Sequence, residues 1–498
     1  MFQTTIQRIT KPRALYVFFA GLLFSVTSAF AEEAGHAAPE VNPVWILPFV
    51  ILLASIAVLP LLAKHFWEKY YGAIAIGLGL VVVGYYLFGL NYPIKLLHTG
   101  HEYISFICLI GSLFIVSGGV LIHIWKPGTP LLNIALLAVG AIIANIFGTT
   151  GASALLIRPF IRINRPRLKP YHIVFFIFIV ANCGGLLTPI GDPPLFLGYL
   201  KGVPFFWLFE HVLPIWVLTV GLILAVFFVI DSRNKTPMTD DPPPKGHGKF
   251  EIEGSHNFIF IVMILLAVLF NSHLPIFVPE AIQIAAALLS LKFTSKSIYE
   301  KNNFSFGPIK EVALLFVGIF ATMIPALQYL ELHASQLGVD TPGMFYWMSG
   351  VLSSVLDNAP TYLTFLSAAF GLHGANLDFS YHMHWILGLY QGVAHVEPSQ
   401  LIGTDTVAPF DSVKALPALM VSSAGQVFPA AKSFMYVMAV SVGAVFFGAV
   451  TYIGNGPNFM VKSIADELGC ETPSFFGYIA KYSLPILIPI FFVVYLIW

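Results

Sequence analysis

Residues 188–194, Thr-Pro-Ile-Gly-Asp-Pro-Pro, interrupt a long apolar segment that begins near Tyr171 and continues past Leu200. Proline has no amide hydrogen and clashes with the preceding helical turn, and glycine adopts backbone conformations closed to other residues. A helix that enters this stretch must therefore stop. Non-helical backbone is tolerated at membrane depth only where protein or a water-filled cavity satisfies its polar groups.

The composition places this broken segment in a membrane protein. Of the 498 residues, 57% are hydrophobic and 10% are charged, and the mean hydropathy is +0.82. Soluble domains carry about 25% charged residues, so we expect an all-α polytopic membrane protein. The formal net charge of zero gives no reason to expect nucleic-acid binding, and the three scattered cysteines show no metal-binding spacing.

The first 31 residues carry a separate signal. Three basic residues precede the apolar run 14–26, and Ala29-Phe-Ala31 matches a small-residue cleavage site. This order is typical of a secretory signal peptide, and the alternative is an uncleaved first span. In either case we expect residues 32–42 to face outward and the protein to lie in the inner or plasma membrane.

Apolar runs of about 20 residues predict about ten transmembrane spans, and lysine and arginine in the short loops set their direction. A charged, proline-rich stretch at 231–256 separates two groups of runs and is predicted to be a solvated cytoplasmic linker. The predicted apolar segments are 45–63, 72–90, 103–124, 131–161, 172–201 and 212–230 before the linker, and 257–270, 281–292, 312–330, 344–370, 433–464 and 475–497 after it.

Two of these segments are predicted to be re-entrant hairpins. Segment 131–161 is too short for two spans, yet basic residues flank both of its ends, at Lys126 and at 158–169. A hairpin with its tip at 148–151 satisfies both observations, and the alternative is one long span with basic residues outside. The second candidate, 344–370, is interrupted at 357–360 by Asp-Asn-Ala-Pro.

Each half then reads span, span, span, hairpin, broken span, span, and the halves start in opposite directions. This order predicts inverted repeats, 44–230 and 257–498, with a site between discontinuous helices near the midplane. Residues 185–196 and 448–459 support the repeat, because six of twelve positions are identical at a constant offset of 263. Asp192 is aligned with Asn455 by this offset.

Asp192 and Asp357 are acidic residues deep within apolar segments, beside helix breakers. A charged group at that depth indicates a functional site, and the alternative is that each carboxylate only caps a helix. Since no lysine or arginine falls in the middle of a predicted span, the two acids favour a cation, which prefers oxygen ligands. The candidate transport and ion-binding residues, at which sodium is the expected metal, are Thr149, Thr150, Ser153, Thr188, Gly191, Asp192, Ser354, Asp357, Asn358, Thr361, Thr451, Gly454, Asn455 and Asn458.

Competition between sodium and a proton for a buried carboxylate gives antiport when it is combined with alternating access. If the hairpin tip and broken helix of each half meet, Asp192 and Asp357 serve two related sites. A channel fits broken helices in inverted repeats less well. An intramembrane metallohydrolase would need outer histidines such as His382 and His384 to converge with a carboxylate. We therefore expect a secondary transporter and no enzyme, with no resident cofactor.

Two motifs carry a family resemblance. Residues 182–194, Asn-Cys-Gly-Gly followed by Leu-Leu and the broken stretch, and residues 353–360, Ser-Ser-Val-Leu-Asp-Asn-Ala-Pro, resemble signatures of citrate-transporter-like and NhaD-type sodium/proton antiporters in the ion transporter superfamily. The likeness extends over residues 44–498. It implies two inverted repeats, often a homodimer, and a transport region that moves in elevator fashion, with hairpin tips and broken helices lining the site.

Within this resemblance, the sequences of the hairpin tips favour cation exchange over dicarboxylate transport. They read Gly-Thr-Thr-Gly and Asp-Asn-Ala-Pro, whereas the dicarboxylate carriers have Ser-Asn-Thr. We therefore expect sodium/proton antiport, with lipid, sodium ions and protons as the partners. The alternative is cation-coupled transport of citrate or another small carboxylate.

Overall fold

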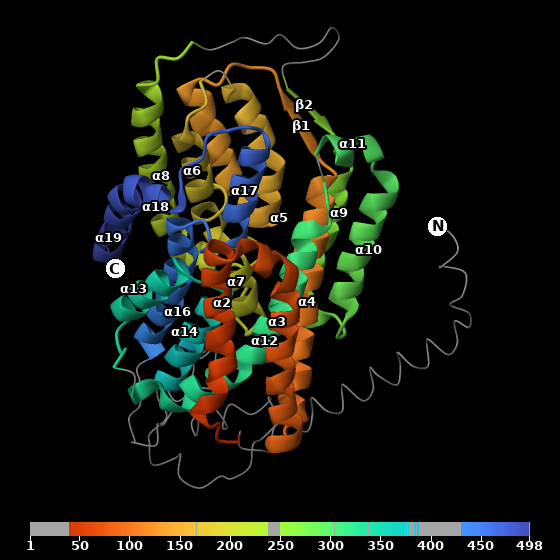
Figure 1. The fold of residues 1–498 in the computed structure, drawn as a ribbon, viewed down its shortest axis with the longest axis vertical. Helices are drawn as coiled ribbons and strands as arrows, with labels where there is room; N and C mark the ends of the chain where they lie inside the picture. The colour runs from red at the N-terminus through yellow and green to blue at the C-terminus, as the bar shows by residue number, and fades with distance from the viewer. Residues whose placement is uncertain are drawn as a thin grey trace, which may run out of the picture.

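A computed structural model describes residues 39–237 apart from 166, 250–373 apart from 303 and 337, 430–497, and the six positions 375, 377, 383, 384, 386 and 387. The predicted leader, His382 and most of the linker lie outside the described residues. From the N-terminal side, the elements before the linker are η3 (Pro43–Ile46), α2 (Leu47–Leu62), α3 (Lys64–Gly84), η4 (Tyr85–Gly89), α4 (Pro93–Gly118), β1 (Leu121–Ile124), α5 (Pro130–Asn164), α6 (Pro170–Ile179), η5 (Cys183–Leu187), α7 (Pro193–Leu200) and α8 (Trp207–Ser232) (Figure 1).

The elements from the C-terminal end of the linker onward are again almost all helical. They are β2 (Phe250–Glu253), α9 (Asn257–Leu269), η6 (Asn271–His273), α10 (Val278–Phe293), α11 (Lys296–Lys301), α12 (Gly307–His333), η7 (Ala334–Gln336), α13 (Pro342–Ser353), α14 (Asn358–Leu372), α16 (Ala430–Phe447), η10 (Gly448–Val450), α17 (Gly456–Glu467), α18 (Phe475–Tyr478), η11 (Ile479–Leu487) and α19 (Ile488–Leu496).

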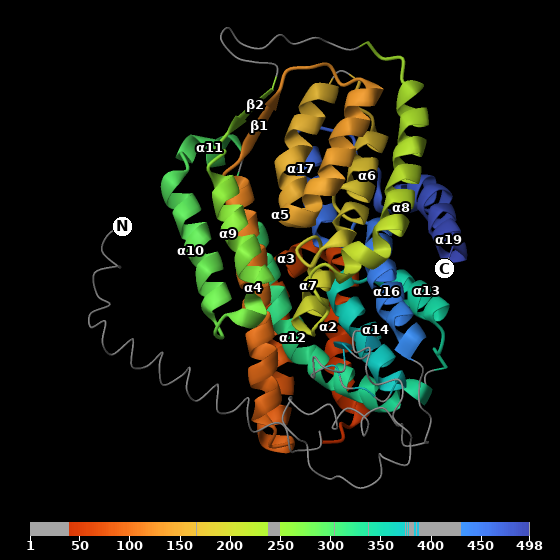
Figure 2. The same cartoon turned by 180° about the vertical axis from the view of Figure 1, so that it is seen from behind.

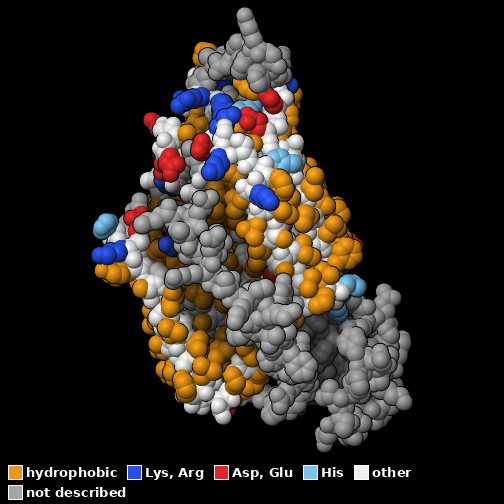
Figure 3. All heavy atoms as spheres, turned by 90° about the vertical axis from the view of Figure 1, so that its right-hand side faces the viewer, with side chains coloured by type: hydrophobic (Ala, Val, Ile, Leu, Met, Phe, Trp, Pro, Cys, Tyr) orange, Lys and Arg blue, Asp and Glu red, His pale blue; other side chains and the backbone are white. Residues whose placement is uncertain are grey.

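Nine helical stretches within the described residues are long and apolar enough to cross a membrane, and α9 is a shorter apolar helix. Large apolar side chains such as Leu62, Phe88 and Leu131 are exposed on their outer faces. Figure 3 shows hydrophobic side chains over much of the described surface, whereas charged side chains gather toward its upper part. These features confirm the predicted all-α, multi-pass membrane protein.

The short helix α7 lies in the interior, where it packs against α4, α14 and α16. Helices α4, α9 and α10 run side by side along one edge of the molecule, whereas α13, α16 and α19 lie toward the opposite edge (Figure 2). The broken segment from α6 to α7 is thus surrounded by helices that come from both sides of the linker.

The prediction of one span over 103–124 is wrong at its C-terminal end. Helix α4 ends at Gly118, and residues 121–124 form strand β1, which pairs antiparallel with β2 so that Leu121 faces Glu253. Gly118 and Gly119 end the helix, and a Cβ on Gly118 would lie 2.4 Å from the Phe304 ring. The strand pair joins the end of α4 to the C-terminal end of the linker.

Helix α5 folds back on itself at Gly148, which has φ +72° and ψ 157°. The Gly128 amide donates to the Ile163 carbonyl at 2.9 Å, and Asn133 Nδ2 donates to Asn164 Oδ1 at 2.8 Å. An uninterrupted helix of this length would separate its ends by about 50 Å, so the two arms must lie together. The placement of these arms in a bilayer and the inverted repeat stay predictions.

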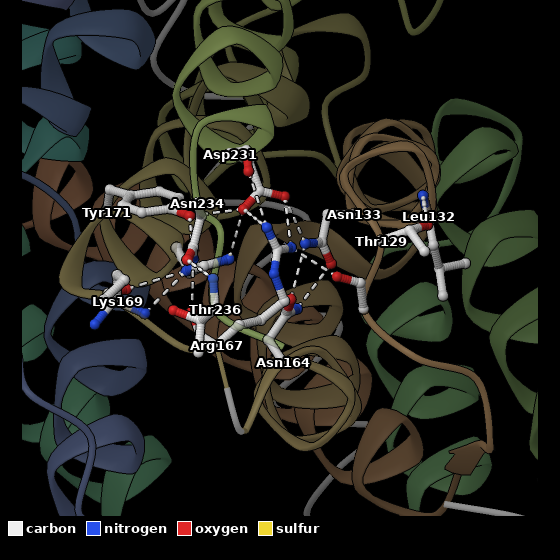
Figure 4. Close-up of polar contacts among 12 residues, drawn as sticks. Thr129, Leu132, Asn133, Asn164, Arg167, Lys169, Tyr171, Asp231, Asn234 and Thr236 are labelled. Atoms are coloured by element: carbon white, nitrogen blue, oxygen red, sulfur yellow. Dashed lines mark hydrogen bonds and ion pairs between the residues drawn. The ribbon is translucent and has the colours of Figure 1, made fainter. Parts of the chain in front are cut away.

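The ends of α5 are joined to α6 and α8 by a buried polar cluster, the Arg167–Asp231 cluster (Figure 4). Arg167 Nη2 lies 2.9 Å from Asp231 Oδ1, and the same carboxylate accepts hydrogen bonds from Tyr171 and Asn133 at 2.6 and 2.9 Å. The fourth contact is His172, whose Nε2 lies 3.1 Å from Asp231 Oδ1.

The prediction that the solvated linker begins at residue 231 is therefore wrong at its first residue. Helix α8 continues to Ser232, and the Asp231 and Arg167 side chains are 0% and 2% exposed. A charge at the end of a span is buried here because Arg167, from the connection between α5 and α6, supplies the counter-charge and three polar side chains of α5 and α6 also contact Asp231.

Candidate functional site

The first broken segment changes direction twice within a few residues. Helix α6 ends at Ile179, a 3-10 turn follows, and the backbone at Thr188 is extended, with φ −135° and ψ 156°. Helix α7 then begins at Pro193 with Asp192 at its N-cap position. Proline in the first helical turn loses no hydrogen bond, because the amide there has no partner within the helix. The carboxylate therefore sits at a helix start inside the protein.

The second broken segment repeats this geometry. Helix α16 is followed by a 3-10 turn and by extended backbone at Thr451, with φ −134° and ψ 167°, and Asn455 occupies the N-cap position of α17. In both segments the backbones of two glycines lie so close together that a side chain on one of them would clash with the other. A Cβ on Gly191 would lie 2.0 Å from the Gly185 carbonyl oxygen, and one on Gly454 would lie 2.7 Å from that of Gly448.

Asp192 is the centre of a polar cluster that we call the Asp192 cluster, formed with Thr149, Asn358 and Asn455. Thr149 Oγ1 donates to Asp192 Oδ1 at 2.6 Å, Asn455 Nδ2 donates to the same oxygen at 3.0 Å, and Asn358 Nδ2 donates to Oδ2. The Asp192 side chain is only 1% exposed. Its partners come from both halves of the chain, so Asp192 does not serve a site of its own half alone.

Two further asparagines, Asn182 and Asn458, orient the side-chain amide of Asn455. Asn182 Oδ1 accepts from Asn455 Nδ2 at 3.2 Å, and Asn182 Nδ2 donates to Asn458 Oδ1 at 2.6 Å. Asn458 Nδ2 in turn donates to the carbonyls of Gly448 and Thr451 at 2.8 and 2.9 Å. The amide of Asn455 is thus held with its NH2 group toward Asp192.

Two further predicted threonines, Thr188 and Thr451, each link a broken segment to the neighbouring helical tip by a hydrogen bond. Thr188 Oγ1 donates to the Asn145 carbonyl at 2.6 Å, and Thr451 Oγ1 donates to the Ser354 carbonyl at the same distance. The Thr149 amide donates to the Gly191 carbonyl at 2.8 Å. These contacts fix the tips of α5 and of the α13–α14 pair beside Asp192.

Asp357 has a different role from Asp192. Its Oδ1 accepts from the Ala359 amide at 3.0 Å and caps α14, while Thr361 Oγ1 donates to the Asp357 carbonyl at 3.0 Å. Asp192 makes no such side-chain cap bond, although it stands at the N-cap of α7. The capping interpretation therefore holds for Asp357 and does not account for Asp192.

A cavity of about 500 Å³ leads to this region. Asp357, Thr150 and Asn455 line one part of it, and Arg158 and Glu467 line another. Arg158 lies in the second arm of α5, and Glu467 is the last residue of α17. The cavity thus extends from Arg158, the first residue of the basic cluster 158–169, to Asn455 of the Asp192 cluster.

Two of the predicted oxygen donors are buried without a hydrogen-bond partner. They are Asn358 Oδ1 and Ser153 Oγ. By contrast, Ser354 Oγ donates to the Val351 carbonyl of its own helix at 2.6 Å. Among the described residues, no three His, Cys, Asp or Glu side chains are arranged so that they could hold a metal ion, so the ligands available at this site are mainly neutral oxygens with two carboxylates.

The predicted site residues leave out Asn182, which appears only within the family motif, and they also miss Asn145. Its Nδ2 donates to the Gly184 carbonyl at 2.7 Å and its Oδ1 accepts from the Leu187 amide at 2.8 Å, so it satisfies the backbone of the broken segment. The available signal was an amide side chain three residues before Gly148 in an otherwise apolar run.

Comparison with known proteins agrees with this architecture. The sequence profile of a family described as putative citrate transport matches residues 38–498. No curated protein matches the chain. The resemblance to citrate-transporter-like proteins is confirmed, while the narrower likeness to NhaD-type antiporters stays a prediction. Because the match covers nearly all of the sequence, the chain belongs to the putative citrate transport family, a family of membrane transporters and not of enzymes.

Proposed function

We propose that this protein is a secondary active transporter that binds a cation, sodium or a proton, at the Asp192 cluster. One observation carries the proposal: the three side chains that donate to the buried Asp192 carboxylate are all neutral. Neutral donors stabilise a carboxylate without cancelling its charge, and an uncompensated charge at membrane depth is costly. A bound cation supplies the missing positive charge.

The surrounding atoms fit a hard monovalent cation. Sodium prefers oxygen ligands, and the unpartnered Asn358 Oδ1 and Ser153 Oγ are buried near the tips that hold Asp192. Asp357 lines the adjoining cavity and provides a second carboxylate close to the entry path. The proposed ligands of the cation, directly or through water, are the side chains of Asp192, Asp357, Asn358 and Ser153.

Exchange of sodium for protons follows from this arrangement. A proton and a sodium ion neutralise the same carboxylate, so the binding of one displaces the other. The cavity reaches the site from one end of the molecule, and alternating access requires that the two helical tips and broken segments later face the other side. Sodium/proton antiport is the function that the side chains favour.

Cation-coupled transport of citrate is the second candidate, and two observations favour it. The family is described by citrate transport, and the cavity wall carries the guanidinium of Arg158, which can pair with a carboxylate. The start of α17 faces the same cavity with the neutral Asn455 at its N-cap, which leaves its positive dipole end uncompensated. Citrate would then enter only after a cation has neutralised Asp192.

Transport measured in everted vesicles separates these two functions. Collapse of a pH gradient by sodium or lithium without citrate supports antiport, whereas a response that requires citrate supports the second candidate. In both cases Asp192→Asn and Asp357→Asn lower the flux, and the control Asp466→Asn does not, since Asp466 is exposed on α17. If both site variants transport like the wild type, the proposed cation site is wrong.

A further inference from the structure

Glu280 is a further buried acid outside the Asp192 cluster, and it lies where α10 packs against α4. The Glu280 side chain is almost fully buried, and Ser105 Oγ of α4 donates to its Oε1. Its other oxygen, Oε2, is buried and has no hydrogen-bond partner. One oxygen of this carboxylate is therefore bound by α4, and the other has no hydrogen-bond partner.

Gln283 presents a second unpartnered acceptor on the same face of α10. Its side chain is 2% exposed, and its Oε1 is buried without a hydrogen-bond partner. Residues three apart on a helix are neighbours on its surface, so the two open oxygens belong to one patch. A single positively charged ligand would satisfy both of these buried acceptors.

The ionisable side chains around Glu280 do not provide a fixed positive charge to its open oxygen. His101 Nε2 lies 3.7 Å from Glu280 Oε1, and only a protonated ring carries charge. Lys201 Nζ is engaged with Glu102 Oε1 at 2.7 Å. Helix α9, which also packs against α10, contains no titratable side chain. The other ionisable side chains along α4 are Lys95, His98, Tyr103 and Cys108.

The backbone beside this patch is strained. Phe277, the residue before α10, has φ +65°, a conformation that L-residues with bulky side chains rarely adopt. Its ring packs edge-on against His101 with the ring centroids 5.0 Å apart. Strain of this kind is concentrated at functional sites, where the surrounding structure holds it.

We propose that Glu280, Gln283 and Ser105 form a second binding site for a monovalent cation, sodium or a proton, in the contact between α4 and α10. A sodium ion there takes the open oxygens of Glu280 and Gln283 and the hydroxyl oxygen of Ser105. A proton there sits on Glu280 Oε2 and is donated to Gln283 Oε1. This site does not depend on the function proposed for Asp192.

Sodium binding to the purified full-length protein tests the first form of the proposal. Equilibrium binding of radioactive sodium is measured for the wild type, for Glu280→Gln and for Glu300→Gln, an exposed glutamate of α11 that serves as the control. If sodium occupies the site, Glu280→Gln binds one ion fewer per chain at saturation and Glu300→Gln binds as many as the wild type.

Infrared difference spectra of the same three proteins test the proton form. If a proton occupies the site, sodium binding is unchanged but the band of a protonated carboxyl group disappears in Glu280→Gln. Gln283→Leu decides the matter if Glu280→Gln does not fold, because it removes only a neutral oxygen: sodium affinity falls several-fold, or the carboxyl band shifts. Unchanged sodium binding together with an unchanged carboxyl band in the folded variants overturns the proposal.

Discussion

Asn455 Nδ2 donates a hydrogen bond to Asp192 Oδ1 at 3.0 Å, and these two residues are separated by 263 positions, the offset that relates the two broken segments. Contact between equivalent residues is what a pseudo-two-fold axis passing between them would produce. Two acids at this contact would repel each other, and two amides would provide no charge. The difference between the halves therefore provides one negative charge at this contact without placing two like charges together.

Exchanging the two residues tests this relationship. We expect Asp192→Asn and Asn455→Asp each to lower cation-dependent flux by about ten- to a hundred-fold, since a hydrogen bond to a charged group contributes roughly 1.5–3 kcal/mol. The double variant restores one acid and one amide in contact, so its flux should exceed that of both single variants. A double variant no more active than the weaker single one would contradict the pairing.

Thr149 should contribute to cation affinity through Asp192. Thr149→Val keeps the shape of the side chain and removes the donor to Asp192 Oδ1. We expect the KM for sodium to rise by about ten-fold, at the lower end of the range for a charged hydrogen bond. Thr364→Val is the control, because the Thr364 hydroxyl donates only to the Pro360 carbonyl of its own helix at 2.8 Å. Equal KM values for both variants would exclude this role.

The Arg167–Asp231 cluster should dominate the stability of the charged end. Asp231→Asn leaves the Arg167 guanidinium buried without its counter-charge, which costs about 3–5 kcal/mol. The control is Asp466→Asn, which breaks the partly exposed pair with Lys462 and costs at most about 1 kcal/mol. Thermal unfolding in detergent should show a much lower Tm for the first variant than for the second.

The strand pair should weaken in acid through Glu253. Partial burial alone would raise the pKa of Glu253, but hydrogen bonds from His123 at 2.8 Å and from Lys301 outweigh it and hold the pKa below its ordinary value. A lowered pKa adds stability above the ordinary value for glutamate, about 4.3, and that stability is lost as the pH falls through the lowered pKa.

Hydrogen exchange of the β1 and β2 amides at several pH values measures this contribution. Protection in the wild type should fall in acid, whereas Glu253→Gln should show weaker protection at neutral pH and a smaller change on acidification. The same loss of protection in both proteins would show that other groups cause it.

Hydropathy predicted most helices because lipid imposes apolar side chains on any span, whatever its partners. The breaks at Gly148 and at residues 188–194 were equally visible, since glycine and proline act locally. The buried state of Asp231 was not predictable, because it depends on Arg167, 64 residues away in the sequence. In the sequence, a charged residue near the end of a span has the same appearance whether it is solvated by water or paired with a buried counter-charge.

The convergence on Asp192 was also only partly predictable. The sequence identified Thr149, Asn358 and Asn455 as oxygen-bearing candidates at breaks, but it grouped them by halves. Asn358 and Asn455 reach Asp192 across 166 and 263 residues. Only the packing of the second half against the first determines that one carboxylate takes donors from both. The four-residue strands β1 and β2 were missed since they are too short to show a period.

The side from which the cavity is open can be tested at Gly456. A Cβ at this position would meet nothing within 4 Å, and the residue lines the cavity, so Gly456→Cys places a thiol in open space. We expect a membrane-impermeant thiol reagent to label it several-fold faster in everted vesicles than in right-side-out vesicles, because Arg158, which also lines the cavity, belongs to the basic cluster 158–169 that is predicted to be cytoplasmic.

The background for this measurement replaces the three native cysteines with serine, and the control is Gly221→Cys. Gly221 also has nothing within 4 Å of an added Cβ, but it lies in α8 and does not line the cavity, so it should label slowly from both sides. Sodium should slow the labelling of Gly456→Cys, since ion binding at Asp192 fixes the neighbouring Asn455. Faster labelling in right-side-out vesicles would place the opening on the outer side and reverse the assigned orientation.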